Sequence, residues 1–187
     1  MAKKRTFYWD SSVIIPFFNA SFEPERAKIA KDLLIEAEGG DLEIVTSTFT
    51  LVEVLKVDRA HPLKPKDEGL IVAFFEKPYI HMVAADRMIC ESARHLIWMH
   101  AALNPKDAVH LASALAYGEK RPLDALFAWD GDFTKLNNLT TQKFPIVHPY
   151  VESPSLESWA QSTGGRKVIL PPNLPTELEE GEQAQGS

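Results

Sequence analysis

The chain of 187 residues has the length of one domain, and its composition, 45% hydrophobic and 25% charged, excludes disorder and fibrous structure for most of it. No apolar run approaches the roughly 20 residues that span a bilayer, and the N-terminus lacks a signal-peptide pattern, which predicts a cytoplasmic protein that does not enter a membrane. The net charge of −6 does not exclude nucleic acid, because residues 171–187 hold four glutamates and no Lys or Arg, which leaves only −2 on the rest.

Segments typical of strands and helices alternate along the chain. The expected strands are 6–10, 42–46, 79–83, 126–129 and 144–148, and the expected helices are 13–19, 25–38, 49–60, 66–76, 87–103 and 108–117. This alternation predicts an α/β fold, with a parallel sheet covered by helices on both faces. In such sheets, sites form where the strands end. Cys90 has no cysteine partner. It lies in the expected helix 87–103, and we expect its side chain in the core of the protein.

The domain organisation follows from where this alternation stops. Residues 1–150 are expected to form the folded domain, and 151–170 a C-terminal extension that is rich in polar residues. Residues 171–187 carry prolines and acids but few large apolar side chains, so we expect a disordered acidic tail.

Four acids stand where a site is expected. Asp10 and Asp130 each directly follow a hydrophobic strand, although either could simply cap a helix or open a turn. Asp107 lies in the first turn of a helix, where it could stabilise the helix dipole. Glu53 is surrounded by apolar residues of its own helix, and a partly buried carboxylate needs a cation.

Together these acids predict a metal site at the carboxyl edge of the sheet. Their mutual repulsion would raise their pKa values unless a multivalent ion neutralised them. Carboxylate oxygens without Cys or paired His ligands suit Mg²⁺ or Mn²⁺. Such an ion can assist the attack of water on a phosphodiester, which makes this the predicted chemistry.

The four acids lie in segments that read FYWDSSVII (7–15), TSTFTLVEV (46–54), DAVHLASAL (107–115) and FAWDGDF (127–133). In this order and at these intervals the segments resemble the signature blocks of PIN-domain nucleases, and most closely those of VapC-type toxins. The resemblance spans about residues 5–150 and implies a PIN-like three-layer α/β/α sandwich with a central, mainly parallel sheet. It also implies an endoribonuclease that depends on Mg²⁺ or Mn²⁺, a cognate antitoxin and a homodimer.

The resemblance assigns roles to individual residues. Its acidic set, both catalytic and metal-binding, falls on four residues: Asp10, Glu53, Asp107 and Asp130. Ser12 is the polar residue beside the first acid, and Asp132 matches an acid that acts around the metal ligands. The family places Thr or Ser two residues before the fourth acid, whereas this chain has Ala128. This departure leaves open an alternative function, a weakly active or inactive PIN-like module that binds RNA or a protein.

Other residues allow two interpretations each. His110, one turn beyond Asp107, either faces the site or is a hydrogen-bonded core group. The tryptophans Trp9, Trp98 and Trp129 could stack on bases, but core packing is favoured for the two that lie in expected strands. A basic stretch after Glu53 either binds an RNA backbone or is a solvated helix end. The candidate RNA-binding residues in it are Lys56, Arg59 and Lys64.

Overall fold

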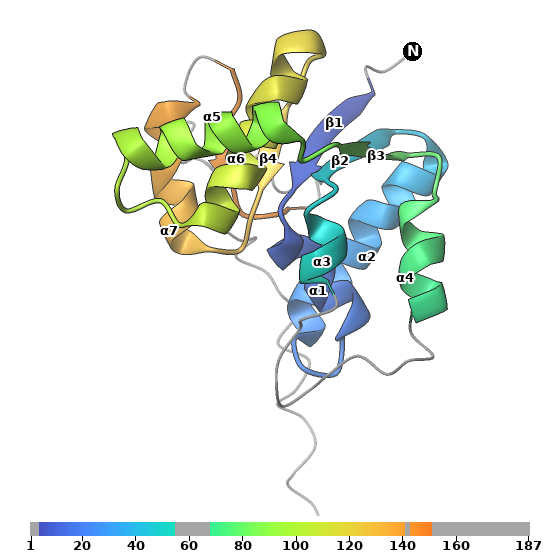
Figure 1. Cartoon of the computed structure of the whole chain (residues 1–187). Helices are drawn as coiled ribbons and strands as arrows, with labels where there is room; N and C mark the ends of the chain where they lie inside the picture. Colours follow the sequence, from blue (N-terminus) through green and yellow to red (C-terminus); the bar gives the residue numbers. More distant parts are fainter. Residues whose placement is uncertain (1–3, 55–67, 141–142, 151–187) are drawn as a thin grey trace, which may run out of the picture.

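The computed structural model describes residues 4–54, 68–140 and 143–150, and at its centre is a five-stranded sheet (Figure 1). The strands are β1 Arg5–Trp9, β2 Leu42–Ser47, β3 Ile80–Val83, β4 Ala125–Phe127 and β5 Ile146–Val147. They lie in the order β3-β2-β1-β4-β5, and each neighbouring pair is parallel. The predicted α/β class is therefore confirmed, and the described sheet is entirely rather than mainly parallel.

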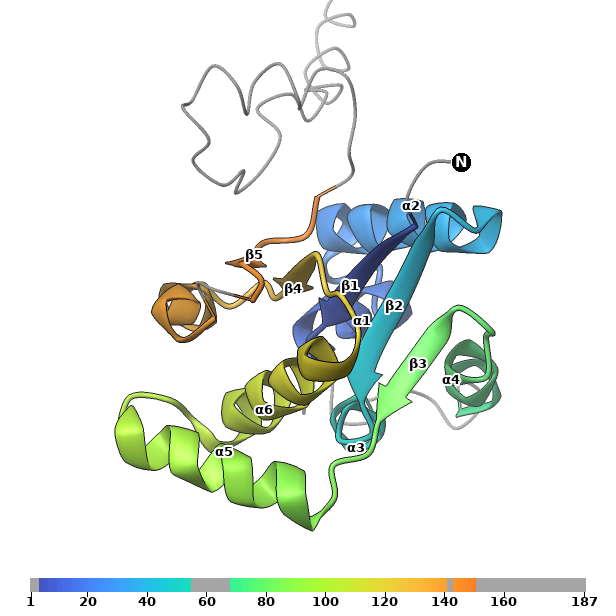
Figure 2. The ribbon, with the colours of Figure 1, turned by 90° about the horizontal axis from the view of Figure 1, so that it is seen from above.

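Helices cover both faces of this sheet, which gives three layers (Figure 2). One face is covered by α1 Ser11–Phe18, α2 Pro24–Gly39 and α4 Glu68–Phe75, and the other by α5 Arg87–Met99, α6 Pro105–Lys120 and α7 Gly131–Thr134. The alternation of side chains along β1 feeds both cores, since Phe7 and Trp9 pack with the first set of helices and Tyr8 with the second. The short helix α3 Thr50–Glu53 follows the end of β2.

The order of the strands reverses at β1. The chain runs from β1 to β2 and β3 in one direction, then crosses back through α5 and α6 to place β4 on the other side of β1. Loops that leave β1 and β4 therefore diverge to opposite faces of the sheet, because α1 lies on one face and α7 on the other. Ligand sites of open α/β sheets form at such a reversal of strand order.

Local signals for helix ends agree well with the structure. Pro24 is the first residue of α2, and Gly40 ends that helix with a φ of 91°, a conformation that costs glycine little. Asn104 caps α6 by accepting the backbone N–H groups of Lys106 and Asp107. The helix expected over 87–103 ends earlier, at Met99, and the turn expected at 130–131 instead leads into α7 and a 3₁₀ helix, Lys135–Leu139.

The core contains most of the expected apolar residues. Trp9 and Trp129 are buried, as predicted, whereas Trp98 is 85% exposed on α5. The prediction that Cys90 belongs to the core is wrong, because its thiol is exposed while Ile89 supplies the buried side of that turn. Among the described residues, no helix is long and apolar enough to cross a membrane.

Candidate functional site

Asp10 is fixed at the point where β1 ends. Its backbone N–H donates to the carbonyl of Phe127 on β4 (2.9 Å), so the residue still belongs to the sheet edge. Its Oδ2 accepts the N–H of Ser12 (3.0 Å) and thereby caps α1. With 5% exposure, the carboxylate is nearly buried, and Oδ1 is the oxygen that remains for other partners.

Side-chain hydroxyls tie the neighbouring strand ends to Asp10. The Oγ of Ser12 accepts the N–H of Trp129 (3.0 Å), which joins the start of α1 to the residue before Asp130. The hydroxyl of Thr46 donates to the carbonyl of Trp9 (2.8 Å), which joins the end of β2 to the end of β1. These two bonds hold the backbone around the site in one arrangement. Asp130 itself is exposed.

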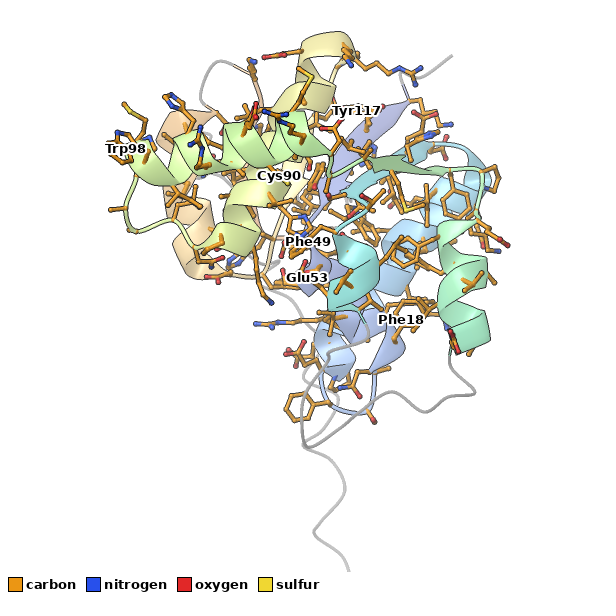
Figure 3. The ribbon with its side chains drawn as sticks, viewed as in Figure 1. Phe18, Phe49, Glu53, Cys90, Trp98 and Tyr117 are labelled. Atoms are coloured by element: carbon orange, nitrogen blue, oxygen red, sulfur yellow. The ribbon has the colours of Figure 1, made fainter. Side chains whose placement is uncertain are left out.

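Glu53 reaches the same region from α3, as Figure 3 shows. Its carboxylate is only 8% exposed, and its two oxygens have different partners. Oε2 lies 2.7 Å from Nε2 of His110, and Oε1 lies 3.3 Å from Nζ of Lys106. The cation that a buried carboxylate needs is therefore supplied by α6.

The pKa of Glu53 reflects this pairing. Burial alone would raise the pKa, but the hydrogen bond and the charge of His110 hold it below its ordinary value. Hydrogen bonds from Ser11 and Lys106 act in the same direction. Conversely, burial opposes the charged form of His110, and the charges of Asp10 and Glu53 outweigh that effect and raise the pKa of the imidazole.

Asp107 shows most directly that the acids converge. Burial raises the pKa of Asp107 to about 7, and the negative charges of Asp10 and Asp130 add to the rise. Glu53 adds a smaller contribution, and His110 opposes it. Geometry brings the acids to the same region at the carboxyl edge of the sheet: Asp10 and Glu53 both face Nε2 of His110, Asp107 precedes His110 by one turn of α6, and Asp130 comes after β4, which pairs with β1.

Carboxylates suit a hard divalent cation, but the oxygens of Asp10 and Glu53 already contact other side chains. In the part of the chain that the structure describes, no three His, Cys, Asp or Glu side chains are arranged to hold one metal ion. Asp10 and Glu53 both face Nε2 of His110, and Glu53 also pairs with Lys106. A shared metal position for the four acids therefore stays a prediction.

The structure describes some of the other candidate residues and not the rest. Lys56, Arg59 and Lys64 lie outside the described residues, and Asp132 lies on α7 with a side chain that is not described. Ala128 is fully buried in the core under α5 and α6. The hydroxyl oxygen of Ser12, the polar residue predicted beside the first acid, accepts the N–H of Trp129.

Two residues of the site were not anticipated from the sequence. Lys106, the neighbour of Asp107, pairs with Glu53, and a cation in the first turn of a helix is an unfavourable placement that could have indicated a partner. Tyr8 hydrogen-bonds His110 at a distance of 3.0 Å. The alternation of side chains along β1 could have placed Tyr8 on the face opposite Trp9, but not against a residue 102 positions away.

The comparisons with known proteins agree with this geometry. A comparison of the sequence with curated proteins finds no match. Among solved structures, Mycobacterium tuberculosis VapC20, a sarcin-ricin loop cleaving toxin, is 19% identical with a TM-score of 0.55, over 69% of this chain and 93% of that one. VapBC2 from Rickettsia felis, bound to a DNA fragment from its promoter, is 11% identical with a TM-score of 0.50, over 75% and 98%. The family model of the PIN domain matches residues 7–139, which include all four acids, and the chain belongs to the PIN-domain family.

Proposed function

We propose that this chain is an endoribonuclease that depends on Mg²⁺ or Mn²⁺ and acts as the toxin of a toxin–antitoxin pair. The observation that carries the proposal is the placement of Asp10, Glu53 and Asp107 around His110, with Asp130 after the neighbouring strand β4, where the strand order reverses. Membership in the PIN-domain family supports a nuclease. The likeness of the fold to VapC20, a sarcin-ricin loop cleaving toxin, favours RNA as the substrate.

The four acids would hold the metal ion, which would supply a water of lowered pKa and stabilise charge on the phosphate. To expose their oxygens, Glu53 must release Lys106, whose side chain is 62% exposed and free to swing outward. From there its ammonium can contact a phosphate of the incoming strand. The hydrogen bonds of the Ser12 N–H to Asp10 and of the Trp129 N–H to the Ser12 hydroxyl keep the loops that carry Asp10 and Asp130 in place during this exchange.

The proposed partners follow from the same comparisons. A cognate antitoxin is proposed from the resemblance to VapC-type toxins, and the likeness of the fold to VapBC2 supports it. A homodimer is part of the same proposal. A second candidate function is an RNA- or protein-binding module without cleavage, favoured by Ala128 and by the existing partners of Glu53 and Asp10.

Cleavage of single-stranded RNA distinguishes the two functions. The purified chain, freed of any copurified protein, should cut RNA in Mg²⁺ or Mn²⁺ and leave 5′-phosphate and 3′-hydroxyl ends, whereas DNA of the same sequence should persist. EDTA should stop the reaction. Asp130→Asn should lose cleavage but keep RNA binding, because it removes a charge of the site without removing a cation.

Asp41→Asn is the matched control, since Asp41 is also exposed but precedes β2 at the opposite edge of the sheet. It should cut RNA as the wild type does. A wild-type chain that binds RNA but cuts none of the RNAs supplied, with either metal, would leave the binding module as the function.

A further inference from the structure

His110 is a fully buried titratable group beside the four acids. It lies on α6, one turn beyond Asp107, and is fully buried. Its Nε2 lies 2.7 Å from Oε2 of Glu53 and 3.4 Å from Oδ1 of Asp10. Its Nδ1 lies 3.0 Å from the hydroxyl oxygen of Tyr8. One ring nitrogen therefore faces two acids of the site, and the other faces a strand residue behind it.

The imidazole ring is held in this position by aromatic packing. The ring of Tyr8, itself fully buried, meets it edge-on with centroids 5.9 Å apart. Phe49, which precedes α3 and is labelled near Glu53 in Figure 3, meets it at 6.1 Å. A close-packed ring with contacts on two sides cannot turn without displacing its neighbours.

The hydrogen-bond partners determine which nitrogen carries the proton. Ionised carboxylates only accept hydrogen bonds, so Nε2, which faces Glu53 and Asp10, must carry a hydrogen. In the neutral ring Nδ1 is then an acceptor, and the hydroxyl of Tyr8 is its donor. Tyr8 meets this requirement because its hydroxyl can donate to Nδ1, which leaves the N–H of the neutral ring on Nε2, toward the acids.

We infer that Tyr8 and His110 form a buried positioning pair that fixes the carboxylates of Glu53 and Asp10 for the reaction. The inference rests on the proposed function, because it concerns the same site. The pair does not contact substrate: Tyr8 holds the ring of His110, whose Nε2 donates to Glu53 (2.7 Å) and lies 3.4 Å from Oδ1 of Asp10, between two acids that come from different elements and repel each other.

The arrangement does more than satisfy a core histidine. By engaging Oε2 of Glu53, the ring leaves Oε1 as the oxygen that reaches the exposed side of the site, where it meets Lys106. Asp10 is held from the other side, since its Oδ2 accepts the N–H of Ser12. Groups of this kind, which orient the residues that hold a metal, change affinity or rate by about 10–100-fold when removed.

The first measurement is the nitrogen-15 NMR spectrum of the histidine rings in the metal-free chain, with the His110 signals identified by their loss in His110→Gln. At a pH where the ring is neutral, the wild type should show a protonated Nε2 and a hydrogen-bonded, unprotonated Nδ1. In Tyr8→Phe the Nδ1 signal should move to the position of a nitrogen without a donor. Tyr79→Phe is the matched control, because it removes a hydroxyl that donates to Glu38 (3.1 Å), a residue outside the site, and should leave His110 unchanged.

The second measurement is RNA cleavage and Mn²⁺ affinity. Tyr8→Phe should lower kcat or weaken Mn²⁺ binding about tenfold, with KM for RNA unchanged, because the acids lose their position and the RNA contacts do not. His110→Gln keeps an N–H near the place of Nε2 and should retain more activity than His110→Leu, which has no donor. Tyr79→Phe should match the wild type.

Each outcome decides the inference. A wild-type ring protonated on Nδ1 alone overturns it, and this reading needs no variant to fold. A Tyr8→Phe chain with the His110 spectrum, kcat and Mn²⁺ affinity of the wild type also overturns it, as does equal activity in His110→Gln and His110→Leu. If the wild type cuts no RNA, the proposed nuclease fails, while the ring spectrum and the Mn²⁺ affinity still decide whether the pair positions the acids.

Discussion

Asp107 offers the sharpest test of how charge is distributed in the site. Its pKa is raised to about 7, first by burial and then by the charges of Asp10 and Asp130. Asp107→Asn keeps the shape of the side chain and an oxygen that can accept the hydrogen bond from the amide of Asn104. The substitution therefore removes the charge while it preserves the cap of α6.

The direction of the effect follows from linkage. A carboxyl whose folded-state pKa is raised binds its proton more tightly when folded, so its contribution to stability is present below about pH 4 and is lost as the pH rises through about 7. The rise from 3.8 to about 7 corresponds to at most about 4 kcal/mol. Because Asp107 is partly exposed, solvent screening reduces the expected effect to about 1–2 kcal/mol.

Urea unfolding in EDTA at pH 5 and pH 8 measures this effect. The free energy of unfolding of Asp107→Asn should rise relative to that of the wild type as the pH increases. The difference between the two should be about 1 kcal/mol larger at pH 8 than at pH 5. Mg²⁺ should reverse the order at pH 8, since an ion that binds only the folded wild type stabilises it by mass action. Asp41→Asn is the control and should show the pH slope of the wild type. Equal slopes for Asp107→Asn and the wild type would refute the convergence of the acids.

Three further predictions concern single contacts. Ser12→Ala should lower the free energy of unfolding by about 1–2 kcal/mol in urea unfolding, because the N–H of Trp129 loses its acceptor; an unchanged value would show that this bond contributes nothing. Lys106→Gln should weaken RNA binding and reduce the slope of log K against log salt by about one in a titration series, whereas an unchanged slope would place Lys106 away from the RNA. Cys90 should react with a thiol reagent in the folded chain at the rate of a free thiol, and protection would contradict its exposure.

The sequence predicts the acids from local patterns, two of them at strand ends and two on helices. Asp10 and Asp130 follow apolar strands directly, and the parallel topology brings such ends to one edge whatever the details of packing. Glu53 was noticed because its helix is apolar around it. In each case a local pattern and a general rule of sheet geometry were sufficient.

Contacts between distant segments could not be obtained in this way. Tyr8 and His110 are 102 residues apart, and Glu53 and His110 are 57 apart, so no periodicity relates them. Cys90 was misplaced for a related reason: a helical pattern shows which residues share a face, but the packing of α5 on α6 decides which face is buried. The Asp-Gly pair at 130–131 is typical of a turn, but in the structure Gly131 begins α7.

The order of the strands also determines when the site can exist during synthesis. β1 is made first and pairs with β2, but its other edge must wait for β4, which begins at Ala125. A growing chain can therefore build β1, β2 and β3 while Asp130 is still absent and Asp10 lacks the carbonyl of Phe127 that holds its backbone. The acids come together only when nearly the whole described domain has emerged. A chain that terminates before β4 therefore retains Asp10, Glu53 and Asp107 but never completes the acidic set.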